Sequence, residues 1–171
     1  MHPFPHRYHV SGAAQPEGTV QLSSAGLPGL ATAPPAEFDG PGDVWSPETL
    51  LVGAVTNCFI LSFRSVAAAS KMPWASLSVA VEGELDRVEK VTQFTQMRIH
   101  AELSVPADVG VERAERLLQR AEQVCLISNS LKASVSLTTD IRVARTAGRL
   151  KAVQQCLLQR GQLQTKPSTC G

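Results

Sequence analysis

The feature that most constrains this chain is its longest apolar stretch, LLVGAVTNCFILSF, which has no charged residue between positions 50 and 63. A helix needs about 20 residues to cross a bilayer, so a stretch of fourteen predicts a buried core helix. Ser46 is a favourable N-cap and Pro47 suits the first helical position. Glu48 places negative charge in the first turn, where the helix dipole favours it. The sequence therefore predicts a long helix over about residues 46–71.

Length, composition and charge exclude several classes of protein. At 171 residues and 18.3 kDa the chain has room for one ordinary domain. Its hydrophobic content of 43% is too high for a disordered chain. Lys and Arg number 16 against 15 Asp and Glu, so the net charge is only +1. This balance gives no reason to expect nucleic acid as a partner, and no membrane partner is expected either.

Hydrophobic periodicity predicts strands on both sides of the central helix. Before the central helix we expect two short strands at 7–11 and 19–24, joined by a hairpin turn, and then an irregular segment at 26–45. After it we expect two long antiparallel strands at 75–86 and 92–105. An amphipathic helix at 108–123, a short helical piece at 127–132 and a final strand at 134–143 complete the order. This order indicates an α+β fold. Residues 1–145 are expected to form the domain, and residues 146–171 a tail that is partly disordered or a short helix.

Four cysteines stand at positions 58, 125, 156 and 170, with no C-x-x-C pair and no neighbouring histidine. Their spacing offers no zinc site, so no metal is expected. The N-terminus lacks the apolar core of a signal peptide, which favours a cytoplasmic, thiol-reducing setting. In such a setting a lone cysteine is most often a small buried hydrophobe, and this is the alternative against which any reactive role must be weighed.

Two segments resemble the signature motifs of the OsmC/Ohr family of thiol peroxidases. The first is PGDVWSPETLLVGAVTNCF at residues 41–59, which carries Cys58 on the central helix. The second is CLISNSL at residues 125–131, which begins with Cys125 and has Leu126 where proline is usual in the family. The order of strands and helices agrees with this resemblance from about residue 7 to residue 144.

The resemblance implies an OsmC-like fold, a curved antiparallel sheet packed on a long buried central helix in an intertwined homodimer. It also implies that Cys58 is the peroxidatic cysteine and that Cys125 resolves its sulfenic acid as a disulfide. The substrate would be an organic hydroperoxide, and the chain would need no cofactor beyond an external thiol or dithiol reductant. A homodimer is expected from the residues as well, because one sheet cannot cover a helix that is apolar nearly all round.

The group that would hold the Cys58 thiolate is the open question of this interpretation. In the family, an arginine from the loop between the first two strands contacts the cysteine, and a glutamate that corresponds to Glu48 holds it. The loop at 12–18 contains no arginine here. Arg7 and His9 on the expected first strand are the nearest candidates in the sequence, with Arg7 as the tentative cation, and a partner subunit could supply another. Glu48 lies about 15 Å from Cys58 by helical rise, and its position also suits a plain helix-dipole carboxylate.

Two alternatives remain open at this stage. A non-catalytic or redox-sensing OsmC-like protein that binds small molecules would keep the fold and lack the usual arginine.

Ser62 and Ser65 lie on the Cys58 face of the helix, but small hydroxyls on such helices are expected to hydrogen-bond to their own backbone.

Overall fold

The computed structural model of the chain describes residues 2–143. The predicted tail, with Cys156 and Cys170, lies outside these residues. The described part contains two three-stranded sheets, two α-helices and two short 3₁₀-helices. The fold class is α+β, as predicted.

The central helix α1 spans Pro47–Ala69, close to the predicted range. Ser46 caps it: its hydroxyl accepts a hydrogen bond from the Thr49 backbone N–H at 3.1 Å, and the Thr49 hydroxyl accepts one from the Ser46 backbone N–H at 2.8 Å. These two hydrogen bonds satisfy the backbone N–H groups of Ser46 and Thr49, which have no partner within the helix, and Ser46 is buried. The cap therefore fixes where the helix begins and, through the helical repeat, where Cys58 lies.

The large sheet is formed by β4 (Ser76–Val88), β5 (Val91–Val105) and β6 (Ser134–Val143). β4 and β5 pair as an antiparallel hairpin, as predicted, through a two-residue turn at Glu89 and Lys90. Both turn residues have positive φ, as the turns that match strand twist require. β6, in contrast, runs parallel to β5, so the sheet is mixed and not wholly antiparallel as expected. The reason is the helical crossover between them, because a helix carries the chain back to the end of the sheet where β5 began.

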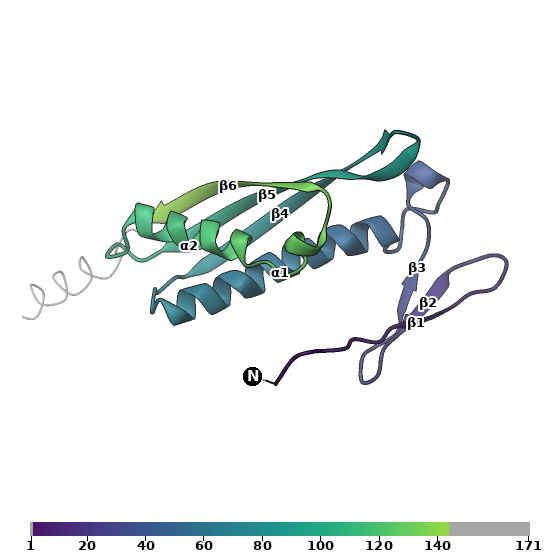
Figure 1. Ribbon diagram of the computed structural model, residues 1–171, viewed down its shortest axis with the longest axis horizontal. Helices are drawn as coiled ribbons and strands as arrows, with labels where there is room; N and C mark the ends of the chain where they lie inside the picture. Colours follow the sequence, from purple (N-terminus) through teal and green to yellow (C-terminus); the bar gives the residue numbers. More distant parts are fainter. Residues whose placement is uncertain (1, 144–171) are drawn as a thin grey trace, which may run out of the picture.

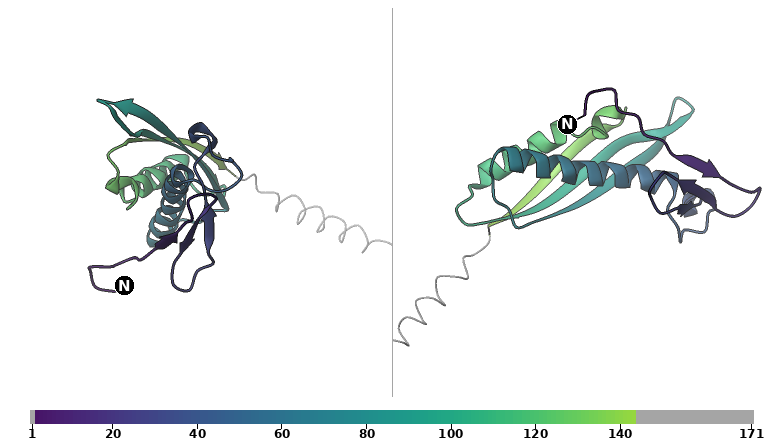
Figure 2. Two further views of the ribbon diagram at one scale, coloured as in Figure 1. Left: turned by 90° about the vertical axis from the view of Figure 1, so that its right-hand side faces the viewer. Right: turned by 90° about the horizontal axis from the view of Figure 1, so that it is seen from below.

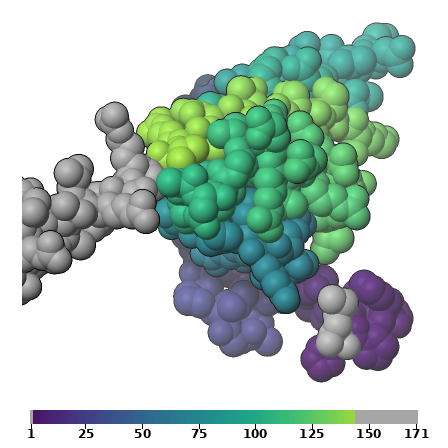
Figure 3. Space-filling view, turned by 90° about the vertical axis from the view of Figure 1, so that its left-hand side faces the viewer, coloured from purple at the N-terminus to yellow at the C-terminus, as the bar shows by residue number. Residues whose placement is uncertain are grey.

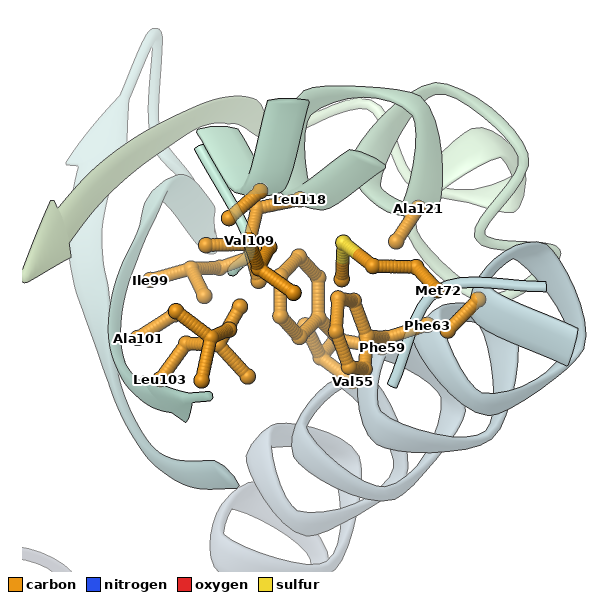
Figure 4. Close-up of a cluster of buried hydrophobic side chains, with 13 residues drawn as sticks. Val55, Phe59, Phe63, Met72, Ile99, Ala101, Leu103, Val109, Leu118 and Ala121 are labelled. Atoms are coloured by element: carbon orange, nitrogen blue, oxygen red, sulfur yellow. The ribbon is translucent and has the colours of Figure 1, made fainter. Parts of the chain in front are cut away.

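That crossover is α2 (Val111–Gln123), followed by the short 3₁₀-helix η2 (Ser128–Ser130). α1 and α2 lie side by side on one face of the large sheet (Figures 1 and 2). The core fills the space between the three elements, and Figure 4 shows its side chains converging from α1, α2 and β5. Its largest fully buried members are Phe59, Phe63, Ile99, Leu103 and Leu118.

One glycine lets α1 approach the sheet. A Cβ on Gly83 in β4 would lie 2.7 Å from the Val52 side chain and 2.8 Å from the ring of Phe94. Both distances are shorter than real Cβ contacts, so any larger residue at this position would force the Val52 side chain and the Phe94 ring to move. The opposite face of the sheet is charged and exposed, where Arg98 pairs with Glu82 at 2.6 Å and also with Glu84.

The small sheet contains β1 (Ser11–Ala13), β2 (Val20–Ser23) and β3 (Leu30–Thr32). The predicted first strand at 7–11 is therefore wrong in position. Ser11 pairs with Ser23, the last residue of β2, so residues before Ser11 have no strand left to pair with. The segment 26–45 was expected to be irregular, yet it holds β3 and the 3₁₀-helix η1 (Ala36–Phe38). The three-residue length of β3 is too short for a periodic signal.

The small sheet stands apart from the body of the molecule. In the space-filling view the N-terminal segments, in purple, project below the helices and the large sheet (Figure 3). Figure 1 shows β1, β2 and β3 near the first half of α1, on the side away from the large sheet. β3 is tied to the start of α1 by a hydrogen bond from the Ala33 N–H to the Trp45 carbonyl at 3.0 Å.

α1 is covered on one side only. It is long and apolar enough to cross a membrane by length and hydropathy alone, a property that it shares with core helices of soluble proteins. Four residues at four-residue spacing, Val55, Phe59, Phe63 and Ala67, are completely buried in the core. Elsewhere apolar side chains stay accessible, and Leu61 is 50% exposed. The predicted core helix is confirmed, with a bare apolar side that the described chain does not cover.

Candidate functional site

Cys58 lies near the middle of α1, on a flank between the core face and the bare side. Its neighbours Val55 and Phe59 are completely buried, whereas Cys58 itself is partly exposed. It lines an open cavity of about 470 Å³ between α1 and the segment after α2. The other lining residues are Ala54, Asn57, Leu61, Ser62, Ser65, Val124, Leu126 and Ile127. The position combines access from solvent with a mostly apolar wall.

Cys125 lies just past the end of α2 and is fully buried. Its backbone N–H donates to the Glu122 carbonyl at 3.1 Å, and its carbonyl accepts from the Asn129 N–H at 3.0 Å. The hydroxyl of Ser128, itself buried, donates a hydrogen bond to the Cys125 sulfur at 3.1 Å. The turn after α2 therefore holds this thiol from both its backbone and a side chain.

The packing of α1 against α2 brings the two cysteines together although they are 67 residues apart in sequence. Both are free thiols, and each affects the pKa of the other. The two side chains therefore lie near each other. The structure thus supports the grouping that the sequence predicted for Cys58 and Cys125.

The surroundings separate the acidities of the two thiols. Burial raises the pKa of Cys58, but hydrogen bonds from the Ile127 N–H, the Cys125 thiol, the Leu126 N–H and the Ser62 hydroxyl outweigh it, so the net pKa is lowered. Burial also raises the pKa of Cys125, and the Ser128 hydroxyl and N–H oppose this only in part, so that pKa stays raised. Cys58 is the thiol that ionises first as the pH rises, which is the property a nucleophile needs.

Ser62 lies beside Cys58 in the same cavity, and hydrogen bonding with its side chain lowers the pKa of Cys58. The expectation that its hydroxyl bonds back to its own backbone stays a prediction. The spacing of four residues along a helix placed it on the same face, which was the available signal. The backbone donors of Leu126 and Ile127 carried no such signal, because every residue type except proline offers the same N–H group.

Glu48 lies away from the two cysteines. It lines cavities of about 550 and 280 Å³ at the start of α1, neither of which Cys58 lines. Its Oε2 atom is buried and has no hydrogen-bond partner among the described residues. An unpaired buried carboxylate oxygen is costly, so this atom has an unused capacity to accept a hydrogen bond.

Arg7 is likewise not brought to the site within one chain. It is exposed on the N-terminal segment, before β1. It is not among the groups that act on the Cys58 thiol. Residues 2–143 also contain no group of three or more His, Cys, Asp or Glu side chains that could hold a metal ion.

Comparison with known proteins agrees with this arrangement. The model of the OsmC-like protein family matches residues 40–140, more than half of the chain, a range that includes Cys58, Cys125 and Glu48. The uncharacterized protein YmaD of Bacillus subtilis (strain 168) is 26% identical over 112 residues, which cover 64% of this chain and 75% of that protein. An organic hydroperoxide resistance protein-like protein of Staphylococcus aureus (strain bovine RF122 / ET3-1) is 24% identical over 114 residues, 64% of this chain and 76% of that protein.

A solved structure shows the same fold. The organic hydroperoxide resistance protein OsmC from Legionella pneumophila superposes with a TM-score of 0.66 at 25% sequence identity. The match covers 82% of this chain and 100% of that one. The two sheets and two helices described above are therefore an arrangement already seen in solved structures.

Proposed function

The chain belongs to the OsmC-like family, and from that premise we propose that it is a thiol-dependent peroxidase that reduces organic hydroperoxides. The observation that carries the proposal is the pair of neighbouring thiols, in which the pKa of the accessible Cys58 is lowered and that of the buried Cys125 is raised. The printed names of the Staphylococcus and Legionella proteins, which refer to organic hydroperoxide resistance, support the same chemistry.

In the proposed reaction the Cys58 thiolate attacks one oxygen of the hydroperoxide and the O–O bond breaks. The alkoxide leaves, takes a proton and becomes the alcohol, while Cys58 becomes a sulfenic acid. The Cys125 sulfur then attacks the Cys58 sulfur, forming a disulfide and releasing water. Two thiol groups of an external thiol or dithiol reduce this disulfide and complete the two-electron cycle.

The walls of the cavity support an organic substrate over hydrogen peroxide. Ala54, Leu61, Val124 and Ile127 present apolar surface around the Cys58 thiol. The alkyl or aryl part of an organic hydroperoxide gains free energy by leaving water for such a surface. The reaction uses no cofactor beyond the reductant. A reducing compartment such as the cytoplasm suits the two free thiols, and we keep it as part of the proposal.

We further propose that the working unit is a homodimer. The bare apolar side of α1 and the small sheet that stands apart from it both call for a second copy. In that dimer Arg7 of a second copy is our candidate for the cation that completes the site. Glu48 is the carboxylate that would hold it, because its Oε2 atom has no partner within the described chain.

The test is turnover of cumene or tert-butyl hydroperoxide by the purified full-length chain with dithiothreitol or a lipoyl-type dithiol. We expect consumption that is lost in Cys58→Ser. Absence of consumption by the unmodified chain would contradict the proposal and favour the non-catalytic or redox-sensing alternative. Consumption that survives in Cys58→Ser would assign the chemistry to another residue.

A further inference from the structure

The cavity beside Cys58 has two unlike walls. Apart from Cys58 and Leu61, the residues that α1 contributes to it are small or polar, namely Ala54, Asn57, Ser62 and Ser65. The segment after α2 contributes three large apolar side chains, those of Val124, Leu126 and Ile127. Most of the apolar bulk around the thiol therefore comes from this segment and not from the helix that carries Cys58.

One of these three side chains does not serve the core. Ile127 is half-buried and packs against the hydrophobic core, and Val124 is half-buried at the end of α2. Leu126 lies between them, yet its side chain is 75% exposed, and the core of residues 2–143 does not include it. The fold of one chain therefore gives the side chain of Leu126 no packing role, although it forms part of the cavity wall.

The backbone around Leu126 is nevertheless held firmly. The carbonyl of Leu126 accepts a hydrogen bond from the Ser130 hydroxyl at 2.8 Å. On its N-terminal side, Cys125 donates to the Glu122 carbonyl at 3.1 Å and accepts from the Asn129 N–H at 3.0 Å. A fixed backbone keeps the exposed side chain at the cavity, so a bound molecule can cover it at little cost in backbone entropy.

The cavity is large enough for a substituent that reaches this wall. Its volume of about 470 Å³ lies within the range of roughly 300–1,000 Å³ that is typical of pockets for drug-sized molecules. Hydrogen peroxide has no apolar part and would leave the wall in water. An aryl or branched alkyl group gains free energy by covering apolar surface, and an exposed leucine beside the thiol offers such surface.

We propose that Leu126 is a specificity-determining residue, whose side chain packs on the apolar substituent of the hydroperoxide while the O–O bond lies at Cys58. The inference rests on the proposed function and deepens it, because it assigns the preference for bulky apolar hydroperoxides to one side chain. It leaves the charge at Cys58 to the proposed Arg7 of a second copy. Leu126 acts on the carbon part of the substrate alone.

The test compares Leu126→Ala with Leu126→Met, which keeps the apolar volume. Leu27→Ala is the matched control, because Leu27 is 67% exposed, lies in a turn and is not among the residues that line the Cys58 cavity. We expect kcat/KM of Leu126→Ala for cumene hydroperoxide to fall by about fivefold to tenfold, mainly through KM, since the lost contact contributes to binding. The value for hydrogen peroxide should be unchanged, and Leu126→Met should retain the activity of the unmodified chain.

A second readout needs no turnover. Alkylation of Cys58 by N-phenylmaleimide and by N-ethylmaleimide is followed by peptide mass spectrometry, and the ratio of the two rate constants reports the contact with an apolar ring. We expect this ratio to fall in Leu126→Ala and to stay unchanged in Leu27→Ala. If the unmodified chain consumes no hydroperoxide, the proposed function fails, and this ratio alone decides whether Leu126 contacts an apolar group at the thiol.

The inference is overturned if Leu126→Ala and the unmodified chain give the same ratio of alkylation rates. It is also overturned if Leu126→Ala loses activity toward cumene hydroperoxide and hydrogen peroxide by the same factor, because that result would show general damage to the site and no selection of the substituent. In either case, turnover by the unmodified chain that depends on Cys58 would leave the proposed function standing.

Discussion

Cys58 and Cys125 carry the same functional group, and their surroundings give them different chemistry. Cys58 is partly exposed, and hydrogen bonding from its surroundings lowers its pKa against the effect of burial. Cys125 is fully buried and receives two from Ser128, through its hydroxyl and its N–H. As the pH rises, the Cys58 thiolate therefore forms before the Cys125 thiolate. This order suits a first thiol that attacks the peroxide and a second that attacks the product.

Ser128 is the positioning residue that this comparison identifies. Its hydroxyl lowers the pKa of Cys125 against the effect of burial, so Ser128→Ala is expected to raise that pKa further. Less Cys125 thiolate then means slower disulfide formation, by roughly threefold to tenfold below the Cys125 pKa. The difference in the rate of disulfide formation between Ser128→Ala and the unmodified chain should shrink as the pH rises through the Cys125 pKa.

Slower disulfide formation lengthens the lifetime of the Cys58 sulfenic acid. Trapping of this sulfenic acid by dimedone, as a function of pH, measures that lifetime. Ser130→Ala is the comparison, because the Ser130 hydroxyl donates to the Leu126 carbonyl at 2.8 Å and not to a sulfur. A sulfenic acid whose lifetime is the same in the Ser128→Ala protein and the unmodified chain would show that the hydroxyl plays no part in resolution.

At the scale of elements, α1 sets the geometry of the site from its first residue. The Ser46 cap determines where the helix begins, and Cys58 lies three turns further on the flank beside the core. Ser46→Ala removes the acceptor of the Thr49 N–H in a buried position. We expect the free energy of unfolding to fall by about 1 kcal/mol.

Urea unfolding followed by circular dichroism measures this loss. The exposed Ser78→Ala on β4 is the control, and its effect should stay within about 0.5 kcal/mol of zero. Equal effects of the two substitutions would mean that the cap does not stabilise α1.

Elements with strong periodicity could be predicted from the sequence, and elements defined by their pairing could not. The cap and the apolar run located α1 to within two residues, and alternation located β4, β5 and β6. The position of β1 and the existence of β3 depend on which short segments pair with β2, and three residues carry no period. The parallel orientation of β6 follows from the crossover through α2, which periodicity alone does not report.

The site shows the same division. The two cysteines were predicted because side-chain motifs mark them, and the structure brings them together. The backbone effect of Leu126 and Ile127 on the pKa of Cys58 could not be predicted, because backbone groups leave no signature in side-chain type. Glu48 could be named from the resemblance and Arg7 from its position near the start of the chain. Within the described chain nothing brings either to Cys58, and their proposed roles depend on a second copy.

At the scale of the whole molecule, the exposed apolar surface predicts self-association. Trp45, at the start of α1, is 51% exposed, Leu61 is 50% exposed, and Phe4 and Tyr8 on the N-terminal segment are more exposed still. Exposed apolar side chains that gather into large patches mark interfaces in soluble proteins. We expect sedimentation equilibrium to give a mass twice the 18.3 kDa of the chain. A mass of one chain at every concentration tested would contradict the homodimer.

The central claim is that Cys58 and Cys125 form one redox pair. The most direct test treats the reduced full-length chain with one equivalent of cumene hydroperoxide, blocks the remaining thiols and maps disulfides by mass spectrometry of unreduced peptides. We predict a disulfide between the peptides that carry Cys58 and Cys125. In Cys125→Ser, treated with a severalfold excess of the hydroperoxide so that further oxidation has an oxidant, we predict sulfinic or sulfonic acid at Cys58 in place of the disulfide. Two unmodified thiols after treatment, or Cys58 joined to a different cysteine, would contradict the account.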